Sequence, residues 1–233
     1  MQEPAGNTNS RHPADLTRRG LILSGMAFLA GCATSGPKKL PTAIWPSASP
    51  RTSEIVVKPT PSVSGITGVE SRLLWAKGRP VPSLMDRMLP IKYITIHHDG
   101  MNPFHGTGAA ECAARVELIR RAHRNRGWGD IGYHFAIDAS GRVWEGRPLN
   151  WQGAHVKDYN EGNIGILVMG NFEQQHPSSA QVSSMQGLVK KIRRKYGIPV
   201  TRVKTHREWA STLCPGRNLQ SQIDLSRSYS RFG

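Results

Sequence analysis

One short apolar run, Ile164-Gly165-Ile166-Leu167-Val168-Met169, constrains the fold of this chain more than any other feature. A strand with one face in water alternates apolar and polar side chains, whereas a strand covered on both faces is apolar throughout. The run is short, and Gly165 within it and Gly170 after it favour a strand over a buried helix. The sequence therefore predicts a central strand with other elements packed on both of its faces.

Extended and helical patterns alternate around this central run. The other predicted strands span residues 93–97, 133–137 and 143–145, and the predicted amphipathic helices span residues 109–125 and 181–196. Gly127 and Gly197 follow the two helices, and glycine commonly ends a helix. Strands and helices mixed in this order predict an α/β domain, with a central mixed β-sheet flanked by helices.

The first 32 residues have the pattern of an export signal. Two arginines at 18 and 19 precede an apolar segment of 12 residues, 20–31, which is well below the roughly 20 residues that cross a bilayer as a helix. The paired arginines resemble a twin-arginine signal, and residues 29–32, Leu-Ala-Gly-Cys, resemble the lipobox of bacterial lipoproteins. This resemblance implies that Cys32 is lipidated and anchors the mature chain on the periplasmic side of a membrane. Ala33 rather than aspartate follows Cys32, which favours the outer membrane over the inner membrane.

A segment rich in Pro, Ser, Thr and Lys extends from residue 33 to residue 68. Its prolines break any long helix and favour extended conformations, and its composition cannot bury enough apolar surface to offset the entropy of ordering. We therefore expect a flexible tether. From residue 69 to residue 233 apolar runs and helical spacings return, and this length suits one globular domain.

The chain carries a net charge of +15, and residues 1–32, with three basic and two acidic residues, contribute only +1 of it. A basic mature chain attracts anionic partners such as a cell-wall polymer, lipid headgroups or nucleic acid, and charge alone does not choose among them. Three cysteines do not suggest a disulfide framework. Of these, Cys112 lies within a helical pattern, and we expect it to be a buried, unreactive thiol.

Three residues far apart in the sequence have the chemistry of a catalytic zinc site. His206 and Cys214 stand eight residues apart, and His97 ends the strand predicted over 93–97. Imidazole nitrogen and thiolate sulfur are good zinc donors, and a catalytic zinc takes three protein ligands and leaves its fourth position for water. His98 follows His97 directly, and neighbouring strand residues point to opposite faces, so the two should not both reach one metal. Periodicity does not choose between them.

These motifs belong to an ordered set that runs through most of the expected domain. The set comprises residues 71–75, 93–98, 127–135, 145–147, 153–155, 163–166, 169–171 and 206–216. As a whole it resembles the zinc-dependent N-acetylmuramoyl-L-alanine amidases, which share a fold with the peptidoglycan recognition proteins. The resemblance implies that fold, zinc as the cofactor, and hydrolysis of the amide between N-acetylmuramic acid and L-alanine in peptidoglycan or muropeptides.

The resemblance also implies which residues form the site. His97 rather than His98 would be the metal ligand, together with His206 and Cys214. Members of this fold that recognise peptidoglycan without cleaving it commonly lack a metal-binding residue at the position of Cys214. Its presence here therefore favours an enzyme.

Further roles follow from the same resemblance. Tyr133 occupies the position of the catalytic tyrosine, and Thr212 stands where animal-type amidases have threonine. Both hydroxyl groups can donate a hydrogen bond to an oxygen that gains negative charge. The residues expected to contact substrate are His155, Asn163 and Arg147, with structural hydrogen bonds as an open alternative for Asn163 and Arg147. The central strand offers no glutamate, which leaves the proton donor to the leaving amine unassigned.

Three functions are compatible with these observations. The leading hypothesis is a monomeric, lipid-anchored periplasmic amidase acting in wall turnover, recycling or lysis. The closest alternative is a receptor of the same fold that binds peptidoglycan without cleaving it. A third is a basic module with a structural metal that binds anionic lipid or nucleic acid. The export signal argues against a cytoplasmic nucleic-acid partner, so we expect none.

Overall fold

A five-stranded mixed sheet forms the centre of the computed structural model, which describes residues 65–233. Its strands are β1 Tyr93–His98, β2 Phe135–Ile137, β3 Val143–Glu145, β4 Asn163–Val168 and β5 Val203–Thr205. Their spatial order is β3-β2-β4-β1-β5, and all neighbouring pairs are parallel except β2 and β3, which are antiparallel. The predicted export signal, Cys32 and residues 33–64 of the predicted tether lie outside the described residues.

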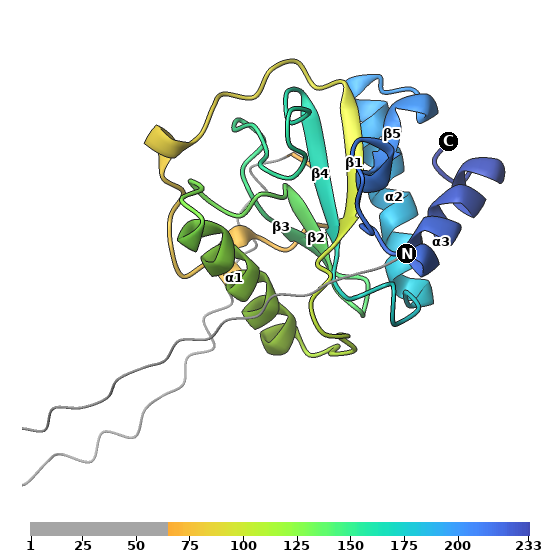
Figure 1. Ribbon diagram of the computed structural model, residues 1–233, viewed down its shortest axis with the longest axis horizontal. Coiled ribbons are helices and arrows are strands. Elements are labelled where there is room, and N and C mark those ends of the chain that lie inside the picture. Colours follow the sequence, from red (N-terminus) through yellow and green to blue (C-terminus); the bar gives the residue numbers. More distant parts are fainter. Residues whose placement is uncertain (1–64) are drawn as a thin grey trace, which may run out of the picture. The chain divides into compact units, whose positions relative to one another are not determined.

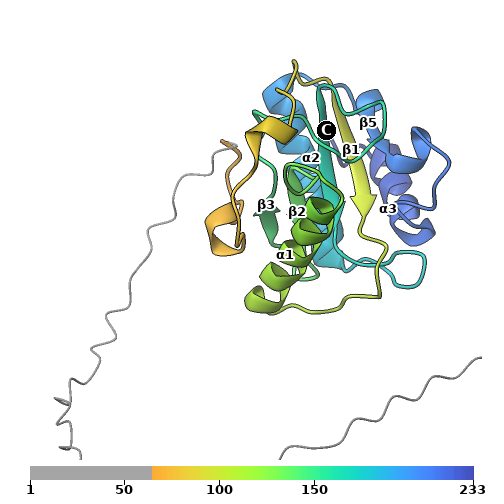
Figure 2. The ribbon, with the colours of Figure 1, turned by 60° about the vertical axis from the view of Figure 1, so that its left-hand side comes forward.

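Within residues 65–233, three α-helices cover the sheet: α1 Ala109–Asn125, α2 Ser179–Tyr196 and α3 Arg217–Ser228. α1 packs on one face, and α2 and α3 pack on the opposite face (Figures 1 and 2). α2 begins after Ser178, whose hydroxyl accepts a hydrogen bond of 3.0 Å from the N–H of Gln181. It ends at Gly197, whose φ of 66° suits a residue without a side chain. None of the helices in this part of the chain is both long and apolar enough to span a membrane.

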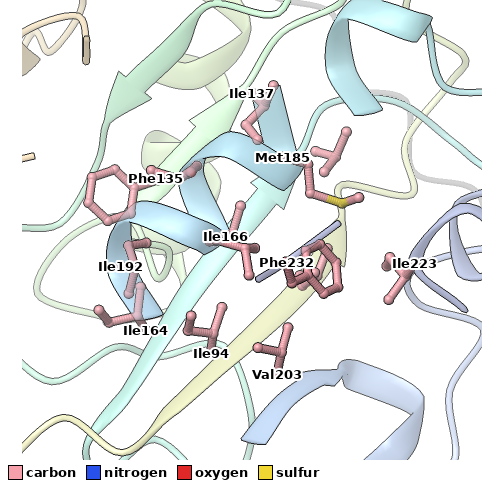
Figure 3. Packing of buried hydrophobic residues seen from close by; sticks show 14 of the residues in the cluster. Ile94, Phe135, Ile137, Ile164, Ile166, Met185, Ile192, Val203, Ile223 and Phe232 are labelled. Atoms are coloured by element: carbon pink, nitrogen blue, oxygen red, sulfur yellow. The ribbon is translucent and has the colours of Figure 1, made fainter. Parts of the chain in front are cut away.

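β4 is covered on both faces, as its unbroken apolar sequence predicts. Ile164, Ile166 and Val168 point into the cluster of buried side chains beneath α2 and α3. The alternate residue Leu167, with Met169 just beyond the strand, points into the cluster beneath α1. Figure 3 shows the first cluster, in which side chains of the central strands meet Met185 and Ile192 of α2 and Ile223 of α3. The predicted central strand is therefore present, with helices on both sides.

The sequence patterns do not predict two elements of the structure, the strand β5 and the helix α3. β5 has three residues, which is too short for a strand period to be visible in the sequence. α3 has only two buried apolar residues, Leu219 and Ile223, and so lacks a clear apolar stripe. Several boundaries differ by one or two residues, and the difference that bears on the site is that β2 begins at Phe135 rather than at Tyr133. Tyr133 therefore lies in the loop that enters the strand.

Candidate metal centre

The pairing of two parallel strands brings His97 and His206 together. β1 and β5 pair in a register that sets Ile96 beside Thr205. One residue further along, His97 is still in β1, and His206 begins the 3-10 turn that follows β5. Parallel strands bring their carboxyl ends to the same edge of the sheet. The two imidazole rings consequently lie 4.8 Å apart, centroid to centroid.

The loop after this turn carries Cys214 to the same edge of the sheet. The N–H of Arg207 donates to the carbonyl of Cys214 at 3.0 Å, and the N–H of Cys214 donates to the hydroxyl of Thr212 at 3.2 Å. Its Sγ atom lies 3.6 Å from Nδ1 of His97. One ligand atom from each of His97, His206 and Cys214 lies within 4.8 Å of the other two. The structure therefore brings together the three candidate metal ligands found in the sequence.

The two neighbouring histidines of β1 point to opposite faces of the sheet, as strand geometry requires. His97 is fully buried, and its ring centroid lies 5.2 Å from that of Tyr133. His98 instead stacks on Phe172 at 6.3 Å, and its Nδ1 accepts a hydrogen bond of 3.2 Å from the N–H of Phe172. The packing of β1 thus determines which of the two histidines faces the cluster, a choice that periodicity leaves open. His97 joins the cluster, while His98 contributes a backbone N–H that donates to Sγ of Cys214 at 3.4 Å.

Burial determines the protonation of all three side chains in the cluster. It raises the pKa of the Cys214 thiol to about 12 and lowers the pKa of both His97 and His206. At neutral pH the two imidazoles are therefore uncharged and have lone pairs to offer. The thiol keeps its proton until a cation displaces it. Two neutral imidazoles and a thiol that a cation can deprotonate match the donor set that zinc prefers.

Two hydroxyl groups adjoin the cluster. Burial raises the pKa of the Tyr133 phenol above its ordinary value, so the group stays protonated and can donate a hydrogen bond. The Oγ1 atom of Thr212 accepts from the N–H of Cys214, which leaves its own proton free to donate. Tyr133 therefore lies beside His97 and Thr212 beside Cys214, and each has a proton available to donate.

His155 lies against His97, and both of its ring nitrogens are engaged within the protein. Nδ1 lies 3.0 Å from Nε2 of His97, and Nε2 lies 3.1 Å from the backbone carbonyl oxygen of Asn163. The side chain is only 7% exposed. Both ring nitrogens of His155 are thus engaged within the protein, and a contact between His155 and substrate stays a prediction. The one sequence signal for this arrangement is Gly165, because a glycine inside a buried strand often marks a close approach by another group.

Asn163 is also buried and has its side chain engaged inside the protein. Its amide nitrogen donates to the carbonyl of Tyr159 at 2.8 Å, and its Oδ1 accepts from the hydroxyl of Thr95 at 3.0 Å. The hydroxyl of Thr95 in turn accepts from the indole N–H of Trp209 at 2.9 Å. These hydrogen bonds tie β4 to β1 and to the loop before it, and the expected substrate contact by Asn163 stays a prediction.

Arg147 has a structural role of a similar kind. It is 3% exposed, and its guanidinium donates to the backbone carbonyls of Asp130, Ile131 and Gln152 at distances between 2.5 and 3.1 Å. Burial lowers the pKa of Arg147 to about 10, so the group remains a cation at neutral pH. Its donors hold together the loops that lead into β2 and out of β3. The expectation that Arg147 binds a substrate carboxylate stays a prediction.

Comparison with known proteins places this geometry in a family. Residues 87–217 match the N-acetylmuramoyl-L-alanine amidase family. Peptidoglycan-recognition protein SC2 of Drosophila simulans is 35% identical over 164 residues, which cover 70% of this chain and 87% of that protein. The N-acetylmuramoyl-L-alanine amidase of Sus scrofa is 31% identical over 180 residues, which cover 74% of this chain and 29% of the pig protein. This chain therefore spans less than a third of the pig protein's length.

A solved structure shows the same architecture. A mutant of Drosophila PGRP-LB in complex with tracheal cytotoxin superposes with a TM-score of 0.62 and 26% sequence identity. The match covers 74% of this chain and 99% of that one. The predicted fold class, a central mixed sheet flanked by helices as in the peptidoglycan recognition proteins, is thereby confirmed.

Proposed function

The chain belongs to the N-acetylmuramoyl-L-alanine amidase family, and from this premise we propose that it is a zinc-dependent hydrolase of peptidoglycan. The bond cleaved would be the amide between N-acetylmuramic acid and L-alanine. The observation that carries the proposal is the cluster of His97, His206 and Cys214 beside the phenol of Tyr133. The substrate class is supported by the name of the pig relative and by the tracheal cytotoxin bound to the Drosophila relative.

The three clustered side chains provide the ligands that a catalytic metal requires. His97, His206 and Cys214 would hold zinc and leave a further coordination position open. Bound there, zinc would activate a water molecule and polarise the scissile carbonyl group. The N–H of His98 that points at Sγ favours the thiolate form of Cys214. The backbone N–H of His98 thus supports the metal ligand Cys214, although the side chain of His98 points away from the cluster.

The hydroxyl donors of the site suit the charge that develops during amide hydrolysis. As water attacks the carbonyl carbon, negative charge grows on the carbonyl oxygen, and a fixed donor stabilises it. The protonated phenol of Tyr133 can donate there, and the free proton of Thr212 gives a second donor. Formation of the new C–O bond and cleavage of the C–N bond leave a lactyl carboxylate on the sugar. The other product is the stem peptide with a free L-alanine amine.

Digestion of defined muropeptides tests this function. We expect the zinc-loaded protein to release free stem peptide and the peptide-free sugar, both identified by mass spectrometry. Treatment with a chelator should stop the release, and added zinc should restore it, because the metal activates the water. An established amidase incubated in parallel shows that the substrate is cleavable.

The opposite result would favour a receptor. A zinc-loaded protein that binds these muropeptides but releases no stem peptide, while the established amidase does, would replace the enzyme with a peptidoglycan-binding function. Zinc content has to be measured on the same sample. Otherwise an empty site would give the same negative result.

We further propose that Cys32 carries the lipid that anchors the protein on the periplasmic side of the membrane, with the outer membrane as its destination. The support is the sequence of residues 18–33 alone, since these lie outside the described part of the structure. Replacement of Cys32 by alanine is expected to abolish incorporation of labelled fatty acid. Replacement of Cys112, a buried thiol, should leave the label unchanged. Labelling that persists in Cys32→Ala would place the modification elsewhere.

A further inference from the structure

Two hydrogen bonds join Asn163, His155 and His97, and the backbone carbonyl of Asn163 sets their direction. The backbone carbonyl of Asn163 can only accept, so Nε2 of His155, 3.1 Å away, carries a proton. His155 is 7% exposed, and among residues 65–233 no hydrogen bond joins its ring to a carboxylate. A second proton would therefore create a buried charge without a counter-charge, which is costly. Nδ1 of His155 consequently holds a lone pair.

The same reasoning extends to His97. Its Nε2 lies 3.0 Å from Nδ1 of His155, and because Nδ1 holds a lone pair, Nε2 of His97 is the donor of that hydrogen bond. A neutral imidazole that carries its proton on Nε2 has its lone pair on Nδ1. Nδ1 is also the atom of His97 that lies 3.6 Å from Sγ of Cys214. The lone pair therefore points into the cluster of candidate ligands.

Two glycines provide the space for the ring of His155. A Cβ atom at Gly153 would lie 2.4 Å from Cδ2 of His155, and a Cβ atom at Gly165 would lie 2.6 Å from the same atom. Both distances are far below van der Waals contact, so no side chain fits at either position without moving the ring. The N–H of His155 also donates to Oδ1 of Asn160 at 2.9 Å. The imidazole is thus held in a slot between a loop and β4.

We propose that His155 is a positioning residue that holds His97 in the tautomer whose Nδ1 lone pair faces the metal position. His155 would act through His97 and would not touch the substrate. The proposal rests on the proposed function, since it assumes that His97 binds a metal. Groups that hydrogen-bond to a metal-binding histidine fix its tautomer and orientation, and their loss weakens metal binding by about 10–100-fold.

The tautomer can be measured directly in the full-length wild-type chain without metal. Nitrogen-15 NMR of the imidazole groups distinguishes a protonated ring nitrogen from one with a lone pair. We expect the proton of His97 on Nε2 and that of His155 on Nε2. A proton on Nδ1 of His97 would overturn the proposal, and this result needs no variant.

Zinc affinity provides the second test. In a competition assay with a chromophoric chelator, His155→Phe should bind zinc about 10–100-fold more weakly than the wild type, because Phe fills the slot but accepts no hydrogen bond. Gly165→Ala should weaken binding in the same direction, since the added methyl group displaces the ring. His176→Phe is the matched control, because His176 is exposed and its loss should leave zinc affinity unchanged.

The outcomes separate this proposal from the proposed function. If His155→Phe keeps the wild-type circular dichroism spectrum and binds zinc within about twofold of the wild type, His155 has no positioning role, although the amidase assignment stands. If the wild-type chain binds no zinc, the proposed function fails instead. If His155→Phe does not fold, the tautomer measured in the wild type decides.

Discussion

Cys214→Ser is expected to lose zinc and to lower amide hydrolysis by at least about 10³-fold, because activation of water depends on the metal. A serine hydroxyl does not ionise under conditions in which a metal-bound thiol does. Burial raises the pKa of the free Cys214 thiol to about 12, so this position is a ligand only when a cation compensates the thiolate. Metal content after gel filtration and release of stem peptide would be measured on the same preparation.

Cys112→Ser is the matched control for this prediction. Cys112 is buried in α1, and its Sγ donates to the carbonyl of Gly106, a bond that a serine hydroxyl can also make. This variant should keep both zinc and activity. Unchanged hydrolysis by Cys214→Ser, with zinc still bound, would remove Cys214 from the mechanism.

Arg147→Met is expected to lower the free energy of unfolding by about 3–5 kcal/mol, because three buried carbonyl groups lose their donor. The methionine side chain has a similar length and keeps the apolar part of the packing. Arg147→Lys should recover part of the loss, since an ammonium group can reach fewer of the three carbonyls. Chemical denaturation followed by circular dichroism measures both variants.

The same variants test the substrate contact that sequence reasoning assigns to Arg147. A residue that binds a substrate carboxylate would raise KM when replaced and leave stability unchanged. Arg121→Met serves as the control, because Arg121 is exposed on α1 and its loss should change stability by no more than about 0.5 kcal/mol. A stable Arg147→Met protein with a raised KM would restore the substrate role.

The sequence predicts the fold best where a pattern is long or uniform. The apolar run of β4 predicts a strand with both faces covered, and the structure confirms it because its alternate residues enter two different clusters. The stripe of α2 and the glycine after it predict a helix over residues 181–196, and the helix spans Ser179–Tyr196. The sequence does not predict β5, because three residues are too few to display a period of two. Yet β5 is the strand that leads directly to His206.

The candidate site divides in a similar way. Residue chemistry and spacing single out His206, Cys214 and His97, with His98 left open beside it. The family resemblance chooses His97 and adds Tyr133 and Thr212. Neither source indicates how deeply a polar side chain is buried. Arg147 and Asn163 lie within the matching motifs, which leave both a substrate contact and structural hydrogen bonds open. Both side chains turn inward and use their hydrogen-bonding groups on the protein itself.

By itself the sequence determined the α/β class, the central strand and the kinds of donor available for a metal, because periodicity and side-chain chemistry are local properties of the chain. Periodicity could not choose between His97 and His98, and the tertiary structure places His97 toward the cluster, since the face of a strand that looks toward a site depends on what packs on each side. It also decided the partner of His97. His155 lies 58 residues further along the chain, and only the close approach permitted by Gly153 and Gly165 brings the two rings into hydrogen-bonding contact.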